Sequence, residues 1–214
     1  MKVWFDTEFM EDGKTIELLS IGAVREDGAC FYAEFEEADY MKANEWVAKN
    51  VLPKLVGASA LKPRRWIVDS FRTFCGEKPE FWAYYSAYDW VSLCQMYGRM
   101  VDLPKGWPLF CRDVKQLCVD RGNPRLPEQT GEHHALADAK WTKAAWDFLS
   151  VRPEETTINL LVELENLFDA FADRVDKCES RIECRDVCHD FMGRLGAIKA
   201  RGMREPQRSE EPNG

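Results

Sequence analysis

The sequence predicts an α/β protein in which a mixed β-sheet is flanked by α-helices, with a helical extension at the C-terminus. Three observations lead to this prediction. Runs of Val, Ile, Trp and Phe between turn residues fill the first 35 residues. Strand-like and helix-like segments then alternate up to about residue 150, as they do in α/β folds. Two long segments with apolar residues at three- and four-residue spacing follow Pro153.

Length and composition divide the chain into three parts. A chain of 214 residues has room for one domain with a full core and an appendage. We expect a domain over residues 1–150, a helical extension over 151–201 and a disordered tail over 202–214. The tail contains Pro206 and Pro212 and has no apolar periodicity.

Net charge and hydropathy exclude some classes of protein. The formal net charge of −8 argues against a broad basic surface that grips nucleic acid. This net charge is still compatible with an enzyme that binds a nucleic acid through bound cations. No stretch approaches the ~20 apolar residues of a membrane span, and the N-terminus lacks a signal peptide. We therefore expect a cytoplasmic protein with no membrane partner.

The eight cysteines are expected to be free thiols, because cytoplasmic proteins rarely keep disulfides. Five of them lie in apolar segments and are predicted to be small core residues: Cys30, Cys75, Cys94, Cys111 and Cys118. Near the C-terminus, Cys178, Cys184 and Cys188 do not match the usual spacing of zinc ligands, so zinc is the less favoured interpretation there.

Three N-terminal strands are predicted to form an antiparallel meander. The first opens with the apolar run Met1–Phe5, and the next two cover residues 15–25 and 30–35. Gly13 supplies one turn, and Asp27 with Gly28 supplies the other.

Helices and strands are expected to alternate in the rest of the first 150 residues. Asn44 caps a short helix over 44–52, which Pro53 ends. The other predicted elements are a helix over 64–75, a buried strand over 80–85, a helix over 86–97, a brief strand over 109–111, a short helix over 112–119, and a helix from His133 or His134 to about Leu149. In the extension, two amphipathic helices are predicted over 154–177 and 180–201.

Two carboxylates follow the first apolar run. Asp6 and Glu8 are two residues apart, so in an extended chain they project from the same face at the end of a buried strand. Adjacent carboxylates repel each other unless a cation lies between them. Hard cations such as Mg²⁺ and Mn²⁺ prefer carboxylate oxygens. The pair therefore predicts half of a metal site, although such a pair at a strand end, taken alone, is more often a solvated turn.

Two more carboxylates lie at helix starts. Asp89 is in the first turn of the predicted helix over 86–97, where the helix dipole alone would favour an anion. Asp138 follows His133 by five residues; polar capping is the alternative for this pair. Four carboxylates spread across a mixed sheet are what two metal ions need, and a histidine can take a proton from the attacking water. We therefore predict a site of Asp6, Glu8, Asp89 and Asp138, with His133.

The chain resembles the DEDDh branch of the 3′→5′ exonucleases, which have a ribonuclease H-like fold. Three segments carry the resemblance: Phe5-Asp6-Thr7-Glu8-Phe9, Tyr84-Tyr85-Ser86-Ala87-Tyr88-Asp89 and His133-His134-Ala135-Leu136-Ala137-Asp138. The third fits the H-x-A-x-x-D pattern of the branch. Within it, residues 1–150 are similar to the ribonuclease AS family of adenylate-preferring exoribonucleases, through Thr15–Gly22, Val51–Leu55, Ala87–Asp89 and Asp120–Arg125.

The resemblance implies a role for each candidate residue. Asp6 would bridge two ions, Mg²⁺ or Mn²⁺; Glu8 and Asp138 would complete one ion's site, and Asp89 would serve the other. His133 would be the general base, because it alone stands five residues before Asp138. Thr7 and Phe9 would contact the terminal nucleotide. Many members carry an Asn shortly before the second-motif Asp, and residues 83–88 contain none, which leaves the hydrogen bonds to the terminal sugar unassigned.

The expected function is a metal-dependent 3′→5′ exoribonuclease that releases nucleoside 5′-monophosphates from single-stranded RNA, with a preference for adenylate. The choice of RNA over DNA rests on the resemblance alone, because no residue is identifiable as a reader of the 2′-hydroxyl. A homodimer is expected on the same basis, and the helical tail would either dimerise or cover the rim of the site. The alternatives are a 3′→5′ exodeoxyribonuclease and a non-catalytic nucleic-acid-binding domain.

Overall fold

The computed structural model describes residues 1–150, 153–178 and 181–202. These residues form two compact units. One consists of residues 1–122 and 126–148, and the other of residues 123–125 and the chain from 149 onward. The predicted disordered tail lies outside the described residues, except for Gly202, which ends a helix.

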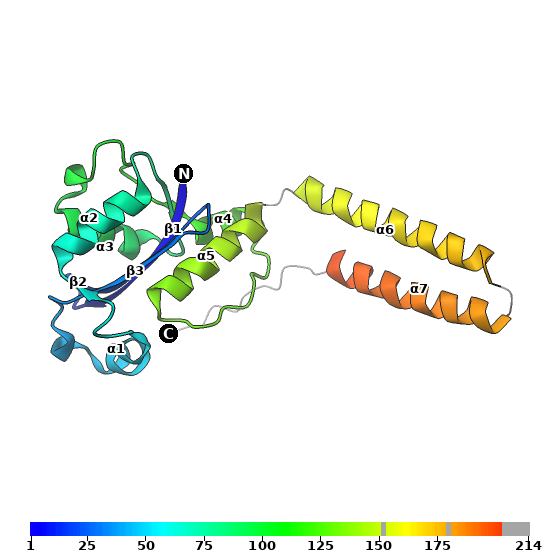
Figure 1. Ribbon diagram of the computed structural model, residues 1–214, viewed down its shortest axis with the longest axis horizontal. Coiled ribbons are helices and arrows are strands. Elements are labelled where there is room, and N and C mark those ends of the chain that lie inside the picture. Colours follow the sequence, from blue (N-terminus) through cyan, green and yellow to red (C-terminus); the bar gives the residue numbers. More distant parts are fainter. Residues whose placement is uncertain (151–152, 179–180, 203–214) are drawn as a thin grey trace. The chain divides into compact units, whose positions relative to one another are not determined.

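A six-stranded mixed sheet forms the centre of the first unit (Figure 1). Its strands, in spatial order, are β4 (Leu61–Lys62), β3 (Cys30–Phe35), β2 (Ile16–Arg25), β1 (Lys2–Glu11), β5 (Glu80–Ala83) and β6 (Arg112–Asp113). Strands β1, β2 and β3 are antiparallel neighbours, so the predicted meander is confirmed. Strands β4, β5 and β6 each run parallel to a neighbour. The predicted α/β fold with a mixed sheet is therefore confirmed.

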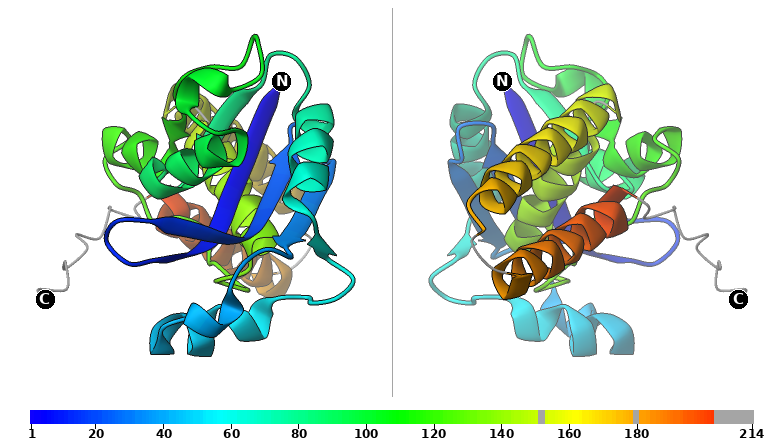
Figure 2. Two further views of the ribbon diagram at one scale, coloured as in Figure 1. Left: turned by 90° about the vertical axis from the view of Figure 1, so that its left-hand side faces the viewer. Right: turned by 90° about the vertical axis from the view of Figure 1, so that its right-hand side faces the viewer.

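Helices cover both faces of this sheet (Figure 2). One face packs against α2 (Arg64–Cys75) and α3 (Ala87–Tyr97), which supply Phe71 and Leu93 to a core shared with Phe5 of β1. On the other face, Trp4 of β1 lies 5.1 Å, centroid to centroid, from Trp146 of α5 (Ala135–Ser150). Alternate residues of β1 thus face different helices, as the pleat of a strand requires.

Short helical segments connect these layers. Helix α1 (Glu45–Asn50) begins where predicted, because the Asn44 side chain accepts a hydrogen bond from the Val47 N–H. Pro53 lies in a 3₁₀ turn (Leu52–Lys54) that ends it. Helix α4 (Val114–Asp120) follows β6, and two further 3₁₀ turns cover Tyr40–Lys42 and Met100–Asp102.

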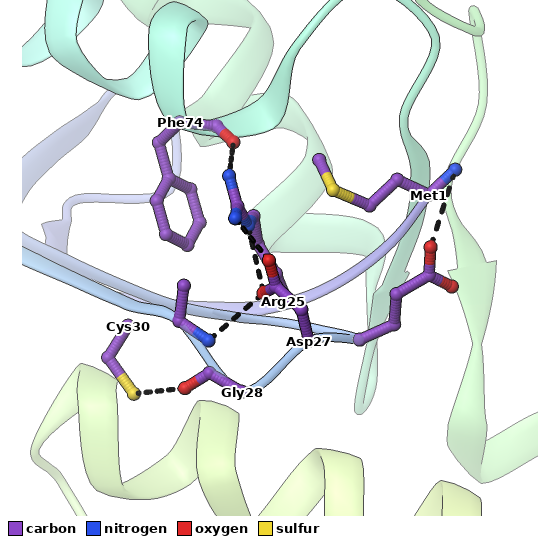
Figure 3. Close-up of polar contacts among 8 residues, drawn as sticks. Met1, Arg25, Asp27, Gly28, Cys30 and Phe74 are labelled. Atoms are coloured by element: carbon purple, nitrogen blue, oxygen red, sulfur yellow. Dashed lines mark hydrogen bonds and ion pairs between the residues drawn. The ribbon is translucent and has the colours of Figure 1, made fainter.

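A polar network fixes the turn between β2 and β3 (Figure 3). Asp27 accepts from the Ala29 N–H at 3.1 Å and pairs with the Arg25 guanidinium. Arg25 also donates to the carbonyl oxygen of Phe74 at the end of α2, at 3.2 Å. This contact ties the hairpin to the helix that covers it. Gly28 takes the left-handed conformation that the predicted turn needs (φ +86°).

Some local predictions are wrong. Strand β1 runs on to Glu11, so Asp6 and Glu8 lie within it, not at its end. The strand predicted over 109–111 lies at Arg112–Asp113 instead, because those residues pair with Trp82 and Ala83; Leu109 and Phe110 are exposed. Strand β4 was not expected. Cys75, Cys94 and Cys118 are buried, but Cys111 is only partly buried and Cys30 is exposed at the start of β3. All eight cysteines are free thiols.

The second unit contains two long helices that run side by side (Figure 1). Helix α6 spans Pro153–Asp176 and helix α7 spans Arg181–Gly202, and each bound lies one residue from the predicted one. Leu167, Val187 and Ile198 are buried in this unit. None of the helices in the described part of the chain is long and apolar enough to cross a membrane.

Candidate active site

The carboxylates of β1 lie where this strand loses one of its neighbours. Strand β5 pairs with β1 only from Lys2 to Trp4. Beyond Trp4, the strand keeps β2 on one side, and its other side is open to side chains. Asp6 and Glu8 follow Trp4 at two-residue spacing, so they point to the face that α5 covers. The predicted common orientation of the two carboxylates is confirmed.

Helix α5 approaches this face closely because of a glycine. Gly22 pairs with Asp6 across the sheet. A Cβ atom on Gly22 would lie 2.2 Å from the Leu136 backbone nitrogen and 2.3 Å from the Ala135 carbonyl carbon. Only a residue without a side chain therefore lets the first turn of α5 rest on β2. This approach brings Asp138, in the same turn, to the carboxylates of β1.

Three of the four predicted carboxylates form a tight group. Ligand oxygens of Asp6, Glu8 and Asp138 all lie within 4.8 Å of one another. Gln129 donates from Nε2 to one Asp138 oxygen at 2.8 Å, and the His133 N–H donates to the other at 2.9 Å. The loop before α5 thus fixes the orientation of Asp138.

Asp89 lies next to this group and is held from β1. Its Oδ1 accepts from the Thr7 N–H at 2.8 Å and from the Thr7 hydroxyl at 2.6 Å. The Thr7 amide is available because β5 has already left that side of β1. Asp89 is 6% exposed and Thr7 is 5% exposed, so this contact is buried. The Asp89 carboxylate therefore accepts the hydrogen bond from β1 that a carbonyl group of a neighbouring strand would otherwise accept.

Burial raises the pKa of all four carboxyl groups, and repulsion from neighbouring carboxylates raises it further for Asp6, Glu8 and Asp89. The pKa of Glu8 rises to about 8, first through burial and then through the charges of Asp138 and Asp89. Burial also raises the pKa of Asp89 to about 6, although the hydrogen bonds from Thr7 oppose this change. The pKa values of Asp6 and Asp138 are raised mainly by burial as well. Such a group holds its negative charges poorly without a cation.

This donor set fits hard divalent cations. The converging carboxylate oxygens of strand β1 and helix α5 match the ligand preference of Mg²⁺ and Mn²⁺. Asp6, Glu8 and Asp138 could hold one ion, and Asp89 lies close enough to raise the pKa of Asp6. No soft ligand belongs to the group in the described residues.

The two adjacent histidines have different surroundings. His134 accepts from the Ala137 N–H at 3.4 Å through Nδ1, and its ring stacks on Tyr32 at 4.5 Å. It acts as the cap of α5. His133 has a left-handed backbone (φ +66°), and its ring meets Trp46 edge to face at 5.0 Å. His133 is therefore the histidine without a structural side-chain hydrogen bond among the described residues.

Phe9 and Thr7, the predicted nucleotide contacts, lie on either side of Glu8. Phe9 stacks on Tyr88 at 5.5 Å, and the two rings are nearly parallel (8°). Tyr88 is 51% exposed and Trp46 is 56% exposed, so aromatic surface borders the site. The Thr7 hydroxyl is engaged by Asp89. Contact of Thr7 and Phe9 with a nucleotide stays a prediction.

Three residues that support the site were not singled out from the sequence, and Thr7, predicted as a nucleotide contact, has a second role there. Gly22, Gln129 and Thr7 act through the contacts given above, Thr7 as the anchor of Asp89. Asp113 at the end of β6 accepts from the N–H and hydroxyl of Ser86, just before α3, at 3.0 and 3.3 Å. It also caps α4. No local pattern marks these roles, because Gly22, Thr7 and Asp113 make their site contacts with residues distant in sequence. The contact of Gln129 with Asp138 spans the loop before α5.

Comparison with known proteins gives consistent matches over the first unit. A family profile described as the 3′-5′ exoribonuclease Rv2179c-like domain matches residues 1–150. Two curated proteins of Mycobacterium tuberculosis, 3′-5′ exoribonuclease Rv2179c of strain H37Rv and 3′-5′ exoribonuclease MT2234.1 of strain CDC 1551, are each 46% identical over 147 residues. The match covers 65% of this chain and 88% of each relative.

Proposed function

The chain belongs to the 3′-5′ exoribonuclease Rv2179c-like domain family, and from this membership we propose that it is a metal-dependent 3′→5′ exoribonuclease. The observation that carries the proposal is the convergence of Asp6, Glu8 and Asp138, with Asp89 beside them. A domain used only for binding would have no need to gather four carboxylates, three of them buried, whose charges oppose one another. The reaction releases nucleoside 5′-monophosphates from a single-stranded 3′ end.

Two divalent cations would activate the attacking water and stabilise the leaving oxygen. In this proposal Asp6 would contribute to the sites of both ions, Glu8 and Asp138 would hold one of them, and Asp89 would hold the other. Gln129 and Thr7 keep Asp138 and Asp89 oriented through the hydrogen bonds they donate. The pKa of each carboxyl group falls when a cation binds, so the site is ionised when it is loaded.

His133 is the general base in the proposal. Its ring makes no structural hydrogen bond to the described residues and packs against the exposed Trp46 at the site's border. A histidine side chain can accept a proton from water at neutral pH, as a general base must. The spacing to Asp138 and the cap formed by His134 both favour His133 over its neighbour.

RNA is the proposed substrate because both curated relatives are named exoribonucleases. We further propose the ribonuclease AS type within the DEDDh branch, with a preference for adenylate. Phe9 and Tyr88 support contact with bases, since stacked aromatic surface binds any base through its ring face. We also propose a homodimer, on the basis of the resemblance to that family.

Digestion of labelled substrates tests the activity. Single-stranded RNA and DNA of one sequence, labelled at the 3′ or the 5′ end, are incubated with Mg²⁺, Mn²⁺ or EDTA. Shortening of RNA from the 3′ end, lost in EDTA and in Asp6→Asn, supports the proposal. Glu11→Gln is the matched control, because Glu11 is an exposed carboxylate of the same strand outside the cluster. Poly(A) and poly(U) then test the adenylate preference.

Two alternatives predict different results. A 3′→5′ exodeoxyribonuclease would shorten DNA as fast as RNA or faster. A non-catalytic nucleic-acid-binding domain would leave both intact, even in a sample that Mn²⁺ stabilises against heat. The buried carboxylates favour the enzyme over this second alternative.

A further inference from the structure

The helical extension has one apolar side that the described residues of its own unit leave exposed. Leu161 and Phe168 of α6 are 54% and 53% exposed, and Met192 of α7 is 64% exposed. This extension lies outside the family match, which ends at residue 150. We call the surface formed by Leu161, Phe168 and Met192 the open flank of the hairpin.

Contacts within the hairpin place these three residues on the same side. Phe171 and Phe191 pack together in the hairpin, with their ring centroids 4.3 Å apart. On α6, Phe168 and Arg174 lie three residues before and after Phe171, about 60° to either side of it. On α7, Asp190 and Met192 adjoin Phe191 on opposite sides.

An ion pair then shows which side of α6 and which side of α7 lie on the same flank of the hairpin. Arg174 pairs with Asp190, so both belong to one flank of the hairpin. Phe168 and Met192 must therefore share the other flank, and Leu161 joins them because it lies seven residues, or two turns, before Phe168. Phe168 also contacts Phe191, at 5.2 Å. One flank of the hairpin is thus polar and paired, and the other is apolar and open.

Charged residues of opposite sign border the two halves of the open flank. Glu165 lies between Leu161 and Phe168 on α6, and Asp169 follows it after one turn; both are exposed. On α7, Arg185 and Lys199 lie seven residues before and after Met192, so they follow the same line. None of these four side chains has an ion-pair partner among the described residues. The α6 edge is therefore acidic and the α7 edge is basic.

We propose that the open flank binds the open flank of a second copy of this chain, in a four-helix bundle. A two-fold axis parallel to the helices sets each α6 against the α7 of the other copy. This pairing buries Phe168 against Met192 and brings acidic edges to basic edges. The other face-to-face pairing, α6 on α6, would set acidic edges against each other, which costs affinity. Charge complementarity selects the first arrangement.

Sedimentation velocity of the full chain, at a series of concentrations, tests the apolar contact. Phe168→Glu should weaken self-association at least about tenfold. Val162→Glu is the matched control: Val162 is 49% exposed on the same helix, but it lies about 120° from Phe168, and its variant should associate like the wild type. Circular dichroism verifies that both variants keep their helices.

Charge reversal tests the pairing without changing the apolar contacts. Glu165→Lys with Asp169→Lys should weaken association, and adding Arg185→Glu with Lys199→Glu to the same chain should restore it. A wild-type chain that stays monomeric overturns the proposal, as does a Phe168→Glu variant that associates normally through some other surface. If the two lysine substitutions do not weaken association, α6 does not face α7 and the proposed arrangement is wrong.

Discussion

Replacing Gly22 by Ala should displace the first turn of α5 and with it Asp138. The backbone at Gly22 is ordinary, so alanine meets no conformational barrier there; the obstacle is space. The new Cβ would lie 2.2 Å from the Leu136 nitrogen, whereas ordinary contacts begin near 3.4 Å. Strand and helix must therefore separate by roughly 1 Å. A shift of ~1 Å in a catalytic group can cost about 10²-fold in rate, and overpacking costs ~1–3 kcal/mol of stability.

The assay measures kcat/KM for mononucleotide release from 3′-labelled RNA, together with urea unfolding. Gly13→Ala is the control for stability alone. Gly13 has φ +80° and open space around it, so alanine there costs about 1–2 kcal/mol through backbone strain and moves nothing in the site. We expect activity to fall steeply in Gly22→Ala and to change little in Gly13→Ala at a temperature where both are folded. Equal activities in the two variants would refute the argument that Gly22 positions Asp138.

Three more predictions concern the carboxylates and the histidines. The folded-state pKa of Glu8 is raised from 4.5 to about 8, so its contribution to stability is full below pH 4.5 and is lost as the pH rises through 8. In EDTA, the Tm of Glu8→Gln minus the Tm of the wild type should therefore increase between these pH values. A Tm difference that stays constant with pH would contradict the prediction. Thr7→Val removes the hydroxyl bond to Asp89 and should cost ~1.5–3 kcal/mol in urea unfolding, whereas Thr7→Ser should keep most of it. His133→Ala should lower the single-turnover rate by about 10²–10⁴ with little change in Tm, whereas His134→Ala should chiefly cost about 1 kcal/mol of stability through loss of the cap; the reverse pattern would exchange their roles.

Local periodicity accounts for what the sequence predicted correctly. The common face of Asp6 and Glu8 follows from the pleat of any strand, whatever its neighbours. The Asn44 cap and the ends of α6 and α7 likewise depend on residues within one or two turns. These features could be read from the chain because their causes are short-range.

Long-range contacts account for what could not be predicted. The bond between Thr7 and Asp89 joins residues 82 positions apart, and its existence depends on where β5 leaves β1. The apolar residues Leu109 and Phe110 suggested a strand, but the two-residue strand β6 follows them because only Arg112 and Asp113 meet β5. Asp6 and Glu8 lie within a strand because pairing with β2 carries β1 on to Glu11.

The close packing of α5 against Gly22 has a consequence for the growing chain during translation. Strand β1 and helix α3 are synthesised early, but Asp138 arrives only with the helix that completes the other face of the sheet. A ribosome-bound chain that has not released α5 holds three of the four carboxylates, and nothing closes the group over β1. Under the proposed function, the enzyme cannot cut RNA until its core is complete. The order of synthesis thereby keeps the nuclease inactive while it is still at the ribosome, close to messenger and ribosomal RNA.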